Sequence, residues 1–334
     1  MRWSLCGWMA VALGFVLSSC GGGGTSKLRI AVVPKGTTHE FWEAIHAGAV
    51  KAERELNEEG VAVEIVWRGP LKEDDRDQQI QVVENFSAGN ADGIVLAPLD
   101  DTALVGPVET AMDSGVPVVI IDSGLNTDRY VSFIATDNHR GGVLAGEKLA
   151  GLLGGRGRVI LVRYQVGSAS TTRREEGFLE AIAKFPDIDV ISSDQFAGAT
   201  RESAYQTCEN LLRRFGLEVD GVFCPNETVT VTMVKALRDI GRAGGAVQVI
   251  GFDTGRQSID DLRQGDLQGL IVQNPLRMGY DGVRAVVAHL LGEAVEKRID
   301  TGVMLVTPAE LDQPELQELL DPPIDLYLNP GDHR

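Results

Sequence analysis

Basic side chains are scarce in this chain: 31 lysines and arginines stand against 48 aspartates and glutamates, and the formal net charge at pH 7 is −17. Proteins that follow the phosphates of nucleic acids, or that bind an anionic membrane surface, need clustered Lys and Arg. The shortage therefore predicts no nucleic acid partner. We interpret the acidic surplus as a contribution to solubility.

The chain also lacks the short motifs of several enzyme classes. His39-Glu40 is not followed by the second histidine of a zinc protease, and the glycines at 154–157 precede a strand-like run, whereas a dinucleotide fingerprint follows one. Neither a phosphate-binding P-loop nor a Gly-x-Ser-x-Gly elbow occurs. We therefore expect no enzyme, no catalytic residues, no cofactor and no metal site.

The apolar run at the N-terminus, from Leu5 to Leu17, is too short for a permanent membrane span. It is followed by Ser18-Ser19-Cys20, and this segment resembles a bacterial lipobox. The resemblance implies a lipoprotein signal peptide over residues 1–19, export across the inner membrane and a lipid on Cys20, with the Gly-rich residues 20–26 as a flexible tether. The alternative is an ordinary signal cleavage that leaves Cys20 unmodified.

Cysteine is rare, with four in the chain. Cys6 lies in the expected signal peptide and Cys20 would carry the lipid, which leaves Cys208 on a predicted helix and Cys224 on the strand that follows it. Export permits a disulfide between these two. The bond has strict geometric requirements, and we favour two small buried thiols over a bridge.

Strand-like apolar runs alternate with helical periodicity along the rest of the chain. In the first helix, apolar residues recur every three or four positions from Phe41 to Leu56, which gives one stripe to lie on a sheet. Strands separated by helices need parallel crossovers, so the pattern predicts an α/β protein with doubly wound parallel sheets. The strands are expected at Leu28–Pro34, Val61–Trp67, Gly93–Pro98, Val116–Asp122, Val131–Ala135, Val159–Arg163, Val190–Ser193, Gly221–Cys224, Val247–Phe252 and Gly269–Gln273. The helices are expected near 41–57, 76–89, 101–114, 139–153, 172–184, 201–215, 228–241, 256–264 and 277–291, with a further short one near 314–320 in the Pro-rich tail.

The segment Val118–Gly142 is interpreted as the crossing between two lobes, because the same alternation ends before it and starts again after it. We expect an N-terminal lobe of residues 27–136 plus 274–301 and a C-terminal lobe of residues 137–273 plus 302–328. Short connections near 123–138, 273–275 and 301–302 would join them as a three-strand hinge. No long linker separates the lobes, so a hinge motion is expected and free tumbling is not.

Polar side chains follow most of the predicted strands. In open parallel sheets, ligands sit beyond the carboxyl ends of the strands, where helix N-termini also point. Asp, Arg, Asn and Gln side chains can bind neighbouring hydroxyl groups on a ring, and Phe41 and Trp42 offer flat apolar faces to its C–H side. This rule selects the windows 35–42, 99–101, 122–123, 137–138, 165–174, 196–200, 226–228, 253–254 and 273–274.

From Lys27 to about Thr307 the chain resembles periplasmic substrate-binding proteins of the ribose-binding type, the extracytoplasmic receptors of sugar ABC importers, whose fold is periplasmic binding protein type I. The matching segments, in order, are THEFW, VVIIDSG, ATDN followed by Gly-Gly, STTRREEGF, VFCPNE, VIGFD and LIVQNP. Carried over position by position, the resemblance implies ligand contacts at Lys35, His39, Phe41, Trp42, Asp122, Ser123, Arg174, Ala199, Asn226, Phe252, Asp253 and Gln273.

Four of these positions depart from the family pattern. His39 stands where ribose binders usually have Asn, Lys35 where they have Ser, Ser123 where they have Arg, and Ala199 where they have an aromatic ring. One stacking surface and one guanidinium are therefore missing, and an ammonium is gained. The ligand is left open between ribose-like sugars, a larger pentose or hexose derivative, and a ligand with an acidic group paired to Lys35 or Arg174.

Some site candidates have structural alternatives. Asp137 and Asn138 are interpreted as capping the following helix, and Trp42 could belong to the core. Arg174 lies in the first turn of a helix, where a cation is unfavourable for the helix dipole, so we favour a ligand contact over a pairing with a neighbouring acid. Asn226 and Asp253 are the strongest candidates.

Together these features predict a monomeric, two-lobed receptor, lipid-anchored outside a bacterial inner or outer membrane, which captures a small carbohydrate-like ligand between its lobes and delivers it to an ABC permease. A ligand bound to both lobes would favour the closed form. The alternatives are a module that presents its ligand to a membrane kinase or chemoreceptor, and a ligand-responsive transcription regulator. The second is disfavoured by the lipobox and by the lack of a basic helix-turn-helix before Lys27.

Overall fold

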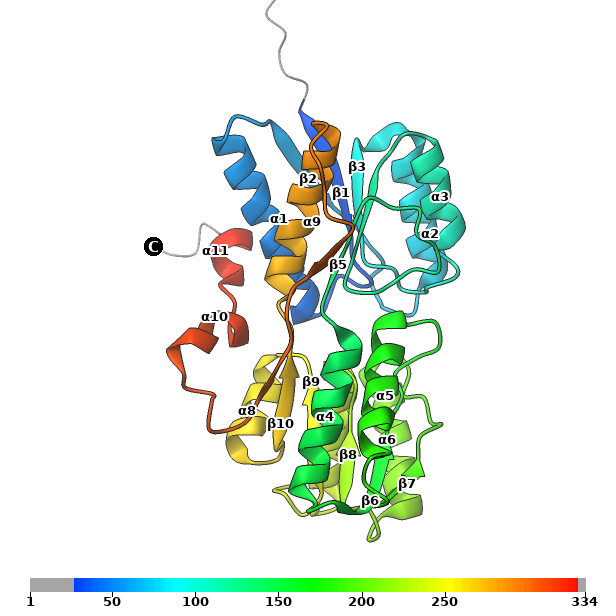
Figure 1. The fold of residues 1–334 in the computed structure, drawn as a ribbon, viewed down its shortest axis with the longest axis vertical. Coiled ribbons are helices and arrows are strands. Elements are labelled where there is room, and N and C mark those ends of the chain that lie inside the picture. Colours follow the sequence, from blue (N-terminus) through cyan, green and yellow to red (C-terminus); the bar gives the residue numbers. More distant parts are fainter. Residues whose placement is uncertain (1–26, 330–334) are drawn as a thin grey trace, which may run out of the picture.

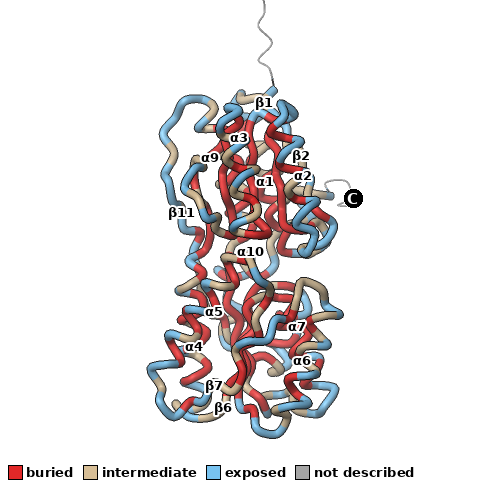
Figure 2. The backbone as a smooth tube through the Cα atoms, turned by 90° about the vertical axis from the view of Figure 1, so that its right-hand side faces the viewer, coloured by how far each residue is buried: buried red, intermediate tan, exposed pale blue. Residues whose placement is uncertain are grey.

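Strands of three to six residues pair into two six-stranded sheets in the computed structural model, which describes residues 27–329. Each sheet forms the centre of one lobe, and the two lobes are stacked along the long axis of the molecule (Figure 1). Helices cover both faces of each sheet, and the buried residues concentrate on the strands and on the helix sides that face them (Figure 2). The predicted α/β class with two doubly wound parallel-sheet lobes is confirmed.

The first lobe has the strand order β11-β5-β4-β3-β1-β2, and its neighbouring strands all run parallel. Alternate residues of β1 face opposite sides, with Ile30 and Val32 packed against α1 and α9, and Ala31 and Val33 packed against α2 and α3. The strands are β1 (Leu28–Val33), β2 (Val63–Trp67), β3 (Gly93–Leu96), β4 (Val118–Ile121), β5 (Phe133–Ala135) and β11 (Arg298–Asp300). The helices are α1 (Glu40–Glu58), α2 (Arg76–Asn85) with the one-turn segment η1 (Phe86–Asn90), α3 (Val105–Asp113) and α9 (Pro275–Leu290).

The second lobe has the order β12-β10-β9-β8-β6-β7 and is parallel except for β12, which pairs antiparallel with β10. Helices α4 and α5 cover one face, and α6, α7 and α8 cover the other. The strands are β6 (Arg156–Leu161), β7 (Asp187–Ser192), β8 (Gly221–Phe223), β9 (Gln248–Phe252), β10 (Gly269–Val272) and β12 (Met304–Val306). The helices are α4 (Asn138–Leu152), α5 (Ala169–Ile182), α6 (Arg201–Phe215), α7 (Glu227–Asp239) and α8 (Arg256–Gln264).

The chain passes between the sheets at three places: from β5 into α4, from β10 into α9, and from β11 to β12. Glycines let the helices beside two of these connections lie against each other. A Cβ at Gly142 of α4 would lie 1.9 Å from the carbonyl oxygen of Arg174 in α5, and one at Gly48 of α1 would lie 1.9 Å from that of Leu276 in α9. The close packing of α4 on α5 holds Arg174 in place.

The C-terminal tail contacts both lobes. It contains the short helices η2 (Pro314–Leu316), α10 (Gln317–Leu320) and α11 (Ile324–Leu328), and Leu316 and Leu320 join the apolar core of the second lobe. The last helix instead lies against α1, where Arg54 donates hydrogen bonds to the carbonyls of Leu326 and Tyr327 at 3.1 and 2.7 Å. The segment from 324 to 328, assigned from the sequence to the C-terminal lobe, therefore packs on the first lobe, because Arg54 satisfies its free carbonyls.

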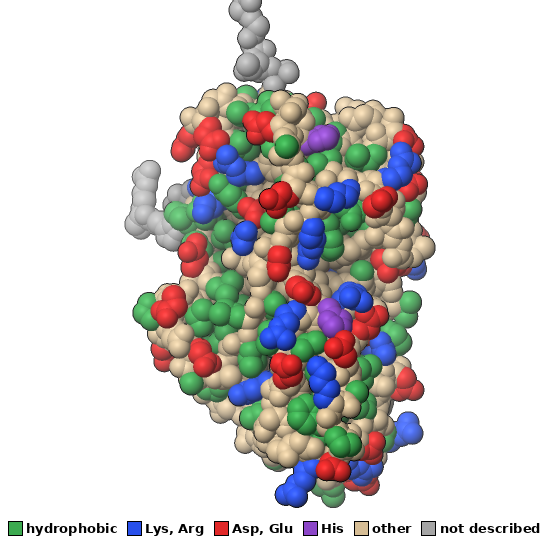
Figure 3. Space-filling view, in the orientation of Figure 1, with side chains coloured by type: hydrophobic (Ala, Val, Ile, Leu, Met, Phe, Trp, Pro, Cys, Tyr) green, Lys and Arg blue, Asp and Glu red, His purple; other side chains and the backbone are tan. Residues whose placement is uncertain are grey.

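Cys208 and Cys224 are both buried free thiols, and burial raises the pKa of Cys208 to about 12. They behave as the small apolar residues expected from the sequence. No helix within residues 27–329 combines the length and the apolar character that a membrane crossing requires. The expected signal peptide, the lipid site at Cys20 and the tether lie outside the described residues. Acidic and basic side chains are interspersed on the face drawn in Figure 3.

Candidate ligand-binding site

The carboxyl ends of the strands in both lobes face one cavity between the sheets, and most of the residues that line it are buried. Lys35 follows β1 and Asp122 follows β4 in the first lobe, whereas Asp253 follows β9 and Gln273 follows β10 in the second. The residues that line the cavity are Lys35, His39, Phe41, Trp42, Glu73, Asp122, Tyr164, Ser168, Ser170, Thr171, Arg174, Asn226, Glu227, Thr228, Asp253 and Gln273. Every residue of the predicted site except Ser123, Ala199 and Phe252 is on this cavity wall.

The cavity is small. The centre of a water-sized sphere can occupy about 40 Å³ of it, which is room for a few waters. A larger groove, of about 760 Å³ by the same measure, lies outside it between α1, α8 and the C-terminal tail. The wall of that groove contains exposed Glu43, Arg256 and Asp325. The small cavity is the better candidate, because its wall is mostly buried and polar groups from both lobes converge on it.

An ion pair forms the first-lobe wall. Lys35 Nζ lies 2.8 Å from Asp122 Oδ2, and both side chains are only 4% exposed. The contact is not aligned as a hydrogen bond, so Asp122 Oδ2 keeps its capacity to accept one from a ligand. Lys35 also donates across the cleft to Ser170 Oγ at 3.2 Å. Ser123 accepts a hydrogen bond from the Ser170 backbone N–H at 3.1 Å; its short side chain thus joins the lobes and is not on the cavity wall, and its role as a ligand contact stays a prediction.

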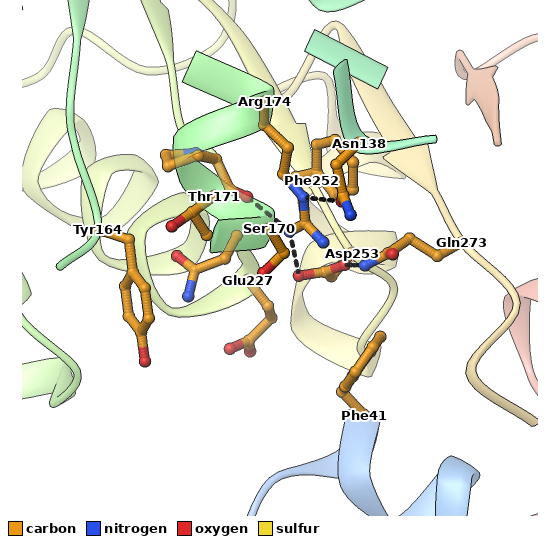
Figure 4. A network of polar contacts seen from close by, with 12 residues as sticks. Phe41, Asn138, Tyr164, Ser170, Thr171, Arg174, Glu227, Phe252, Asp253 and Gln273 are labelled. Carbon is orange, nitrogen blue, oxygen red and sulfur yellow. Dashed lines mark hydrogen bonds and ion pairs between the residues drawn. The ribbon is translucent and has the colours of Figure 1, made fainter. Parts of the chain in front are cut away.

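Arg174 is held from three sides in the second lobe (Figure 4). Its Nε donates to Asn138 Oδ1 at 2.7 Å and its Nη1 to the Pro225 carbonyl at 2.8 Å, and the guanidinium lies 3.8 Å from the centre of the Phe252 ring. Phe252 is therefore a platform under Arg174 and not a part of the cavity wall, because the guanidinium covers its face. Ala199, also outside the wall, packs against the apolar core of the second lobe.

From the sequence, Asp137 and Asn138 are both expected to cap α4. This prediction is correct for Asp137 and wrong for Asn138. Asp137 caps α4 by accepting a hydrogen bond from the Arg140 N–H at 2.9 Å. Asn138 is buried and orients Arg174 instead. The difference arises because a helix N-cap needs one side-chain acceptor, and Asp137 already supplies it.

Asp253 supplies a buried carboxylate beside Arg174. Arg174 Nη1 lies 3.5 Å from Asp253 Oδ2, and Gln273 Nε2 donates to Asp253 Oδ1. Burial raises the pKa of Asp253, while Arg174 and Gln273 oppose the rise. Gln273 Oε1 has no partner within the described chain although it is buried, and Asn226 uses its own Oδ1 to cap α7 at Val229 N–H. A ligand hydroxyl that donates to Gln273 and accepts from Asn226 would satisfy both amides.

His39 and Glu227 meet across the cleft. Their Nε2 and Oε2 atoms are 2.6 Å apart, and Glu227 also accepts a hydrogen bond from Arg201 at 2.9 Å. Burial alone would lower the pKa of His39, but the Glu227 carboxylate outweighs it and raises the pKa to about 9. Burial likewise opposes the net lowering of the Glu227 pKa by His39 and Arg201. At neutral pH we therefore treat this contact as an ion pair. In the neutral ring Nδ1 can accept the Phe41 N–H, 3.1 Å away, and cap α1.

Several residues of the cavity wall were missed in the sequence. Glu227 and Thr228 lay inside a selected window, as did Ser168, Ser170 and Thr171. Glu227 ends the VFCPNE segment, and Ser170 and Thr171 begin STTRREEGF, but the resemblance implied no ligand contact at these positions. Tyr164 lies one residue before such a window. Glu73 lies after β2, the strand end for which no window was chosen, and its position beyond that strand is the signal that could have found it.

Comparisons with known proteins agree with this architecture. A family model described as periplasmic binding protein domain matches residues 30–294. The xylitol-binding protein of Mycolicibacterium smegmatis is 26% identical over 90% of this chain and 83% of its own length. A ribose import binding protein of Haemophilus influenzae is 28% identical over 89% of this chain and 97% of its own. A carbohydrate transporter solute binding protein from Agrobacterium radiobacter, solved in complex with D-arabinose, superposes with a TM-score of 0.83 at 32% identity, covering 89% of this chain and 99% of the other.

Proposed function

The chain belongs to the periplasmic binding protein domain family, and from this membership we propose that it is the extracytoplasmic receptor of an ABC importer for a small sugar or sugar-like ligand. The observation that carries the proposal is the convergence of strand-end acids, amides and one arginine from both lobes on one cavity with mostly buried walls. The relatives are binding proteins and not enzymes, as the missing catalytic motifs predicted. No separate observation favours the sensor alternative.

Hydroxyl recognition follows from the groups that the cavity presents. Asp122 Oδ2 and Gln273 Oε1 are buried acceptors without hydrogen-bond partners in residues 27–329, and Arg174 and Asn226 are donors beside them. Phe41 and Trp42 meet edge to face, with ring centres 5.0 Å apart, and supply an apolar wall for the C–H face of a ring. An analogue that lacked one hydroxyl would leave a buried group unpaired, at a cost of about 1–3 kcal/mol.

The charges favour a neutral ligand over a sugar acid. Lys35 is already paired with Asp122, and Arg174 with Asp253, so neither cation is free to bind a carboxylate or a phosphate. An anionic ligand would have to displace one of these buried acids and leave it uncompensated. Of the ligands left open by the sequence, this argument supports a pentose, a hexose or a polyol.

Closure of the lobes is the proposed capture step. The cavity wall comes from both lobes, so only the closed arrangement lets a ligand make all its contacts, and binding shifts the population toward that arrangement. The three connections between the sheets are the proposed hinge, and the lobe limits given from the sequence are kept as part of this proposal, except that residues 324–328 belong with the first lobe. The lipid at Cys20, the tether and the monomeric state are likewise proposals that rest on the sequence.

A ligand screen tests the function. Ligand-induced stabilisation should raise the melting temperature of the wild type with one or more of D-ribose, D-allose, D-arabinose and xylitol, and calorimetry should then give a 1:1 complex. D-Ribonate and D-gluconate are the matched acids, which should give no shift. A protein that responds to none of the neutral compounds while binding the acids would contradict both the ligand class and the charge argument.

A further inference from the structure

Glu73 occupies an unusual place in the cleft. It lies in the loop between β2 and α2 of the first lobe, and its carboxylate accepts two hydrogen bonds from aromatic side chains. Oε1 accepts from Trp42 Nε1 at 2.7 Å within the same lobe, and Oε2 accepts from the Tyr164 hydroxyl of the second lobe at 2.9 Å. The Glu73 carbonyl also accepts from Gln165 Nε2 at 3.3 Å. One loop residue thus fixes a ring of each lobe.

The burial of the two rings makes these bonds important. Trp42 is 3% exposed and Tyr164 is 2% exposed, so an indole N–H or a phenol O–H without an acceptor would be costly there. Burial first, and then Glu73, raise the pKa of Tyr164 well above its ordinary value, so the hydroxyl remains a donor. Gly36 makes room for the carboxylate, because a Cβ at that position would lie 2.9 Å from Glu73 Cγ.

We propose that Glu73 is a positioning residue that couples the orientation of Trp42 to closure of the lobes. The bond to Trp42 lies within one lobe and persists when the lobes separate, whereas the bond to Tyr164 exists only when they meet. Glu73 therefore holds the Trp42 ring in its binding orientation in the open protein, and it slows opening of the closed protein. This role deepens the proposed function and depends on it, because it assumes that the cavity binds a ligand.

The rival role is direct ligand contact, since Glu73 and Tyr164 both line the cavity. The two roles differ in their effect on selectivity. A group that acts through closure changes the affinity for every ligand by one factor, because the ligand does not touch it. A group that binds a ligand hydroxyl changes the affinity only for ligands that carry this hydroxyl.

The experiment uses the full chain with Trp3→Phe, Trp8→Phe and Trp67→Phe, which leaves Trp42 as the only tryptophan of four. Into this background we place Glu73→Gln, Tyr164→Phe and the double variant. Asp74→Asn is the matched control, because it removes the same charge from the adjacent, exposed position of the loop. The readouts are the emission maximum of Trp42 without ligand, and Kd and koff for D-arabinose, D-allose and xylitol.

We expect Glu73→Gln to shift the Trp42 emission without ligand, and Tyr164→Phe and Asp74→Asn to leave it unchanged. Glu73→Gln and Tyr164→Phe should each raise Kd about tenfold, mainly through koff, by the same factor for every ligand bound, and the double variant should be no worse than the worse single one. A factor that differs between ligands, additive effects in the double variant, or an unaltered koff would overturn the proposal. If the wild type binds neither these three compounds nor D-ribose, the proposed function fails, and an unchanged emission in Glu73→Gln then independently refutes the Trp42 contact.

Discussion

Raising the pH through the pKa of His39 should weaken ligand binding. The substitution His39→Gln should abolish this dependence on pH. His39 and Glu227 belong to opposite lobes, so their ion pair forms only on closure. In the closed structure the pKa of His39 is raised from the ordinary 6.5 to about 9. A group whose pKa is raised by closure stabilises the closed form fully below the ordinary value, and this contribution is lost as the pH rises through the raised value.

The size of the effect follows from the same shift. A change from 6.5 to about 9 corresponds to about 3 kcal/mol as an upper limit. The deprotonated ring can still donate its Nε2–H to Glu227, and it regains the capping bond from the Phe41 N–H. The pKa shift already includes this neutral hydrogen bond, because it compares the two protonation states of the ring, and with these two pKa values we expect Kd to rise by up to about 60-fold between pH 7 and pH 9.5.

The assay is calorimetric titration of the best ligand from the screen at half-unit steps from pH 6 to pH 9.5. The charged groups around His39 are Glu227, Glu73 and Asp253, with Arg201 on the far side of Glu227. His39→Gln keeps a side-chain donor toward Glu227 but does not titrate, so its Kd should be nearly constant over this range. Parallel profiles for the wild type and His39→Gln, or a wild-type affinity that increases with pH, would refute the assignment.

The remaining predictions concern the site, the packing and the anchor. The double variant Asp253→Ala, Asn226→Ala should lose ligand binding by more than about 100-fold in calorimetry, and its ligand-free melting temperature should also fall, because Asn226 caps α7 and Asp253 pairs with the buried Arg174; retained affinity in the folded variant would rule out the site. Gly142→Ala should destabilise the protein by about 1–3 kcal/mol in urea unfolding because its Cβ would meet a backbone carbonyl at 1.9 Å, whereas Gly151→Ala in the same helix, with open space around it, should be neutral or stabilising. Cys20→Ser should move the protein from the membrane fraction to the soluble fraction, and unchanged fractionation would contradict the lipoprotein proposal.

The fold was largely predictable because its signals are local. Buried parallel strands appear as continuous apolar runs, and the helices between them have one apolar stripe each, so both kinds of element stand out in the sequence. The strand β11 was missed because Arg298 and Asp300 are charged and exposed, so it lacks the apolar run that revealed the equally short β5 and β8. The strand β12 was missed as well. It runs antiparallel to β10 because the chain enters the second lobe from the cleft, toward which the parallel strands direct their carboxyl ends, and this direction has no sequence signal of its own.

The candidate site was predictable in so far as it depends on strand ends. The rule that ligands lie beyond parallel strands found Asp122, Arg174 and Asp253 without knowledge of how the lobes meet. Contacts that form only between lobes were not predictable, because the pairing of Glu73 with Tyr164 joins residues 91 positions apart that belong to different sheets. Their partners are set by the angle between the lobes, which no local pattern encodes.

The backbone has an unusual conformation at two strand ends, those after β4 and β9. Within residues 27–329, the residues other than glycine with positive φ are Asp122, at 60°, and Asp253, at 71°. Each directly follows the central part of its sheet, after β4 in one lobe and β9 in the other, and each places a carboxylate on the cavity wall. Glycine would adopt this conformation with less strain. Stability alone therefore favours glycine at both positions, and the occurrence of aspartate at equivalent points of two lobes supports the proposal that both carboxylates bind the ligand.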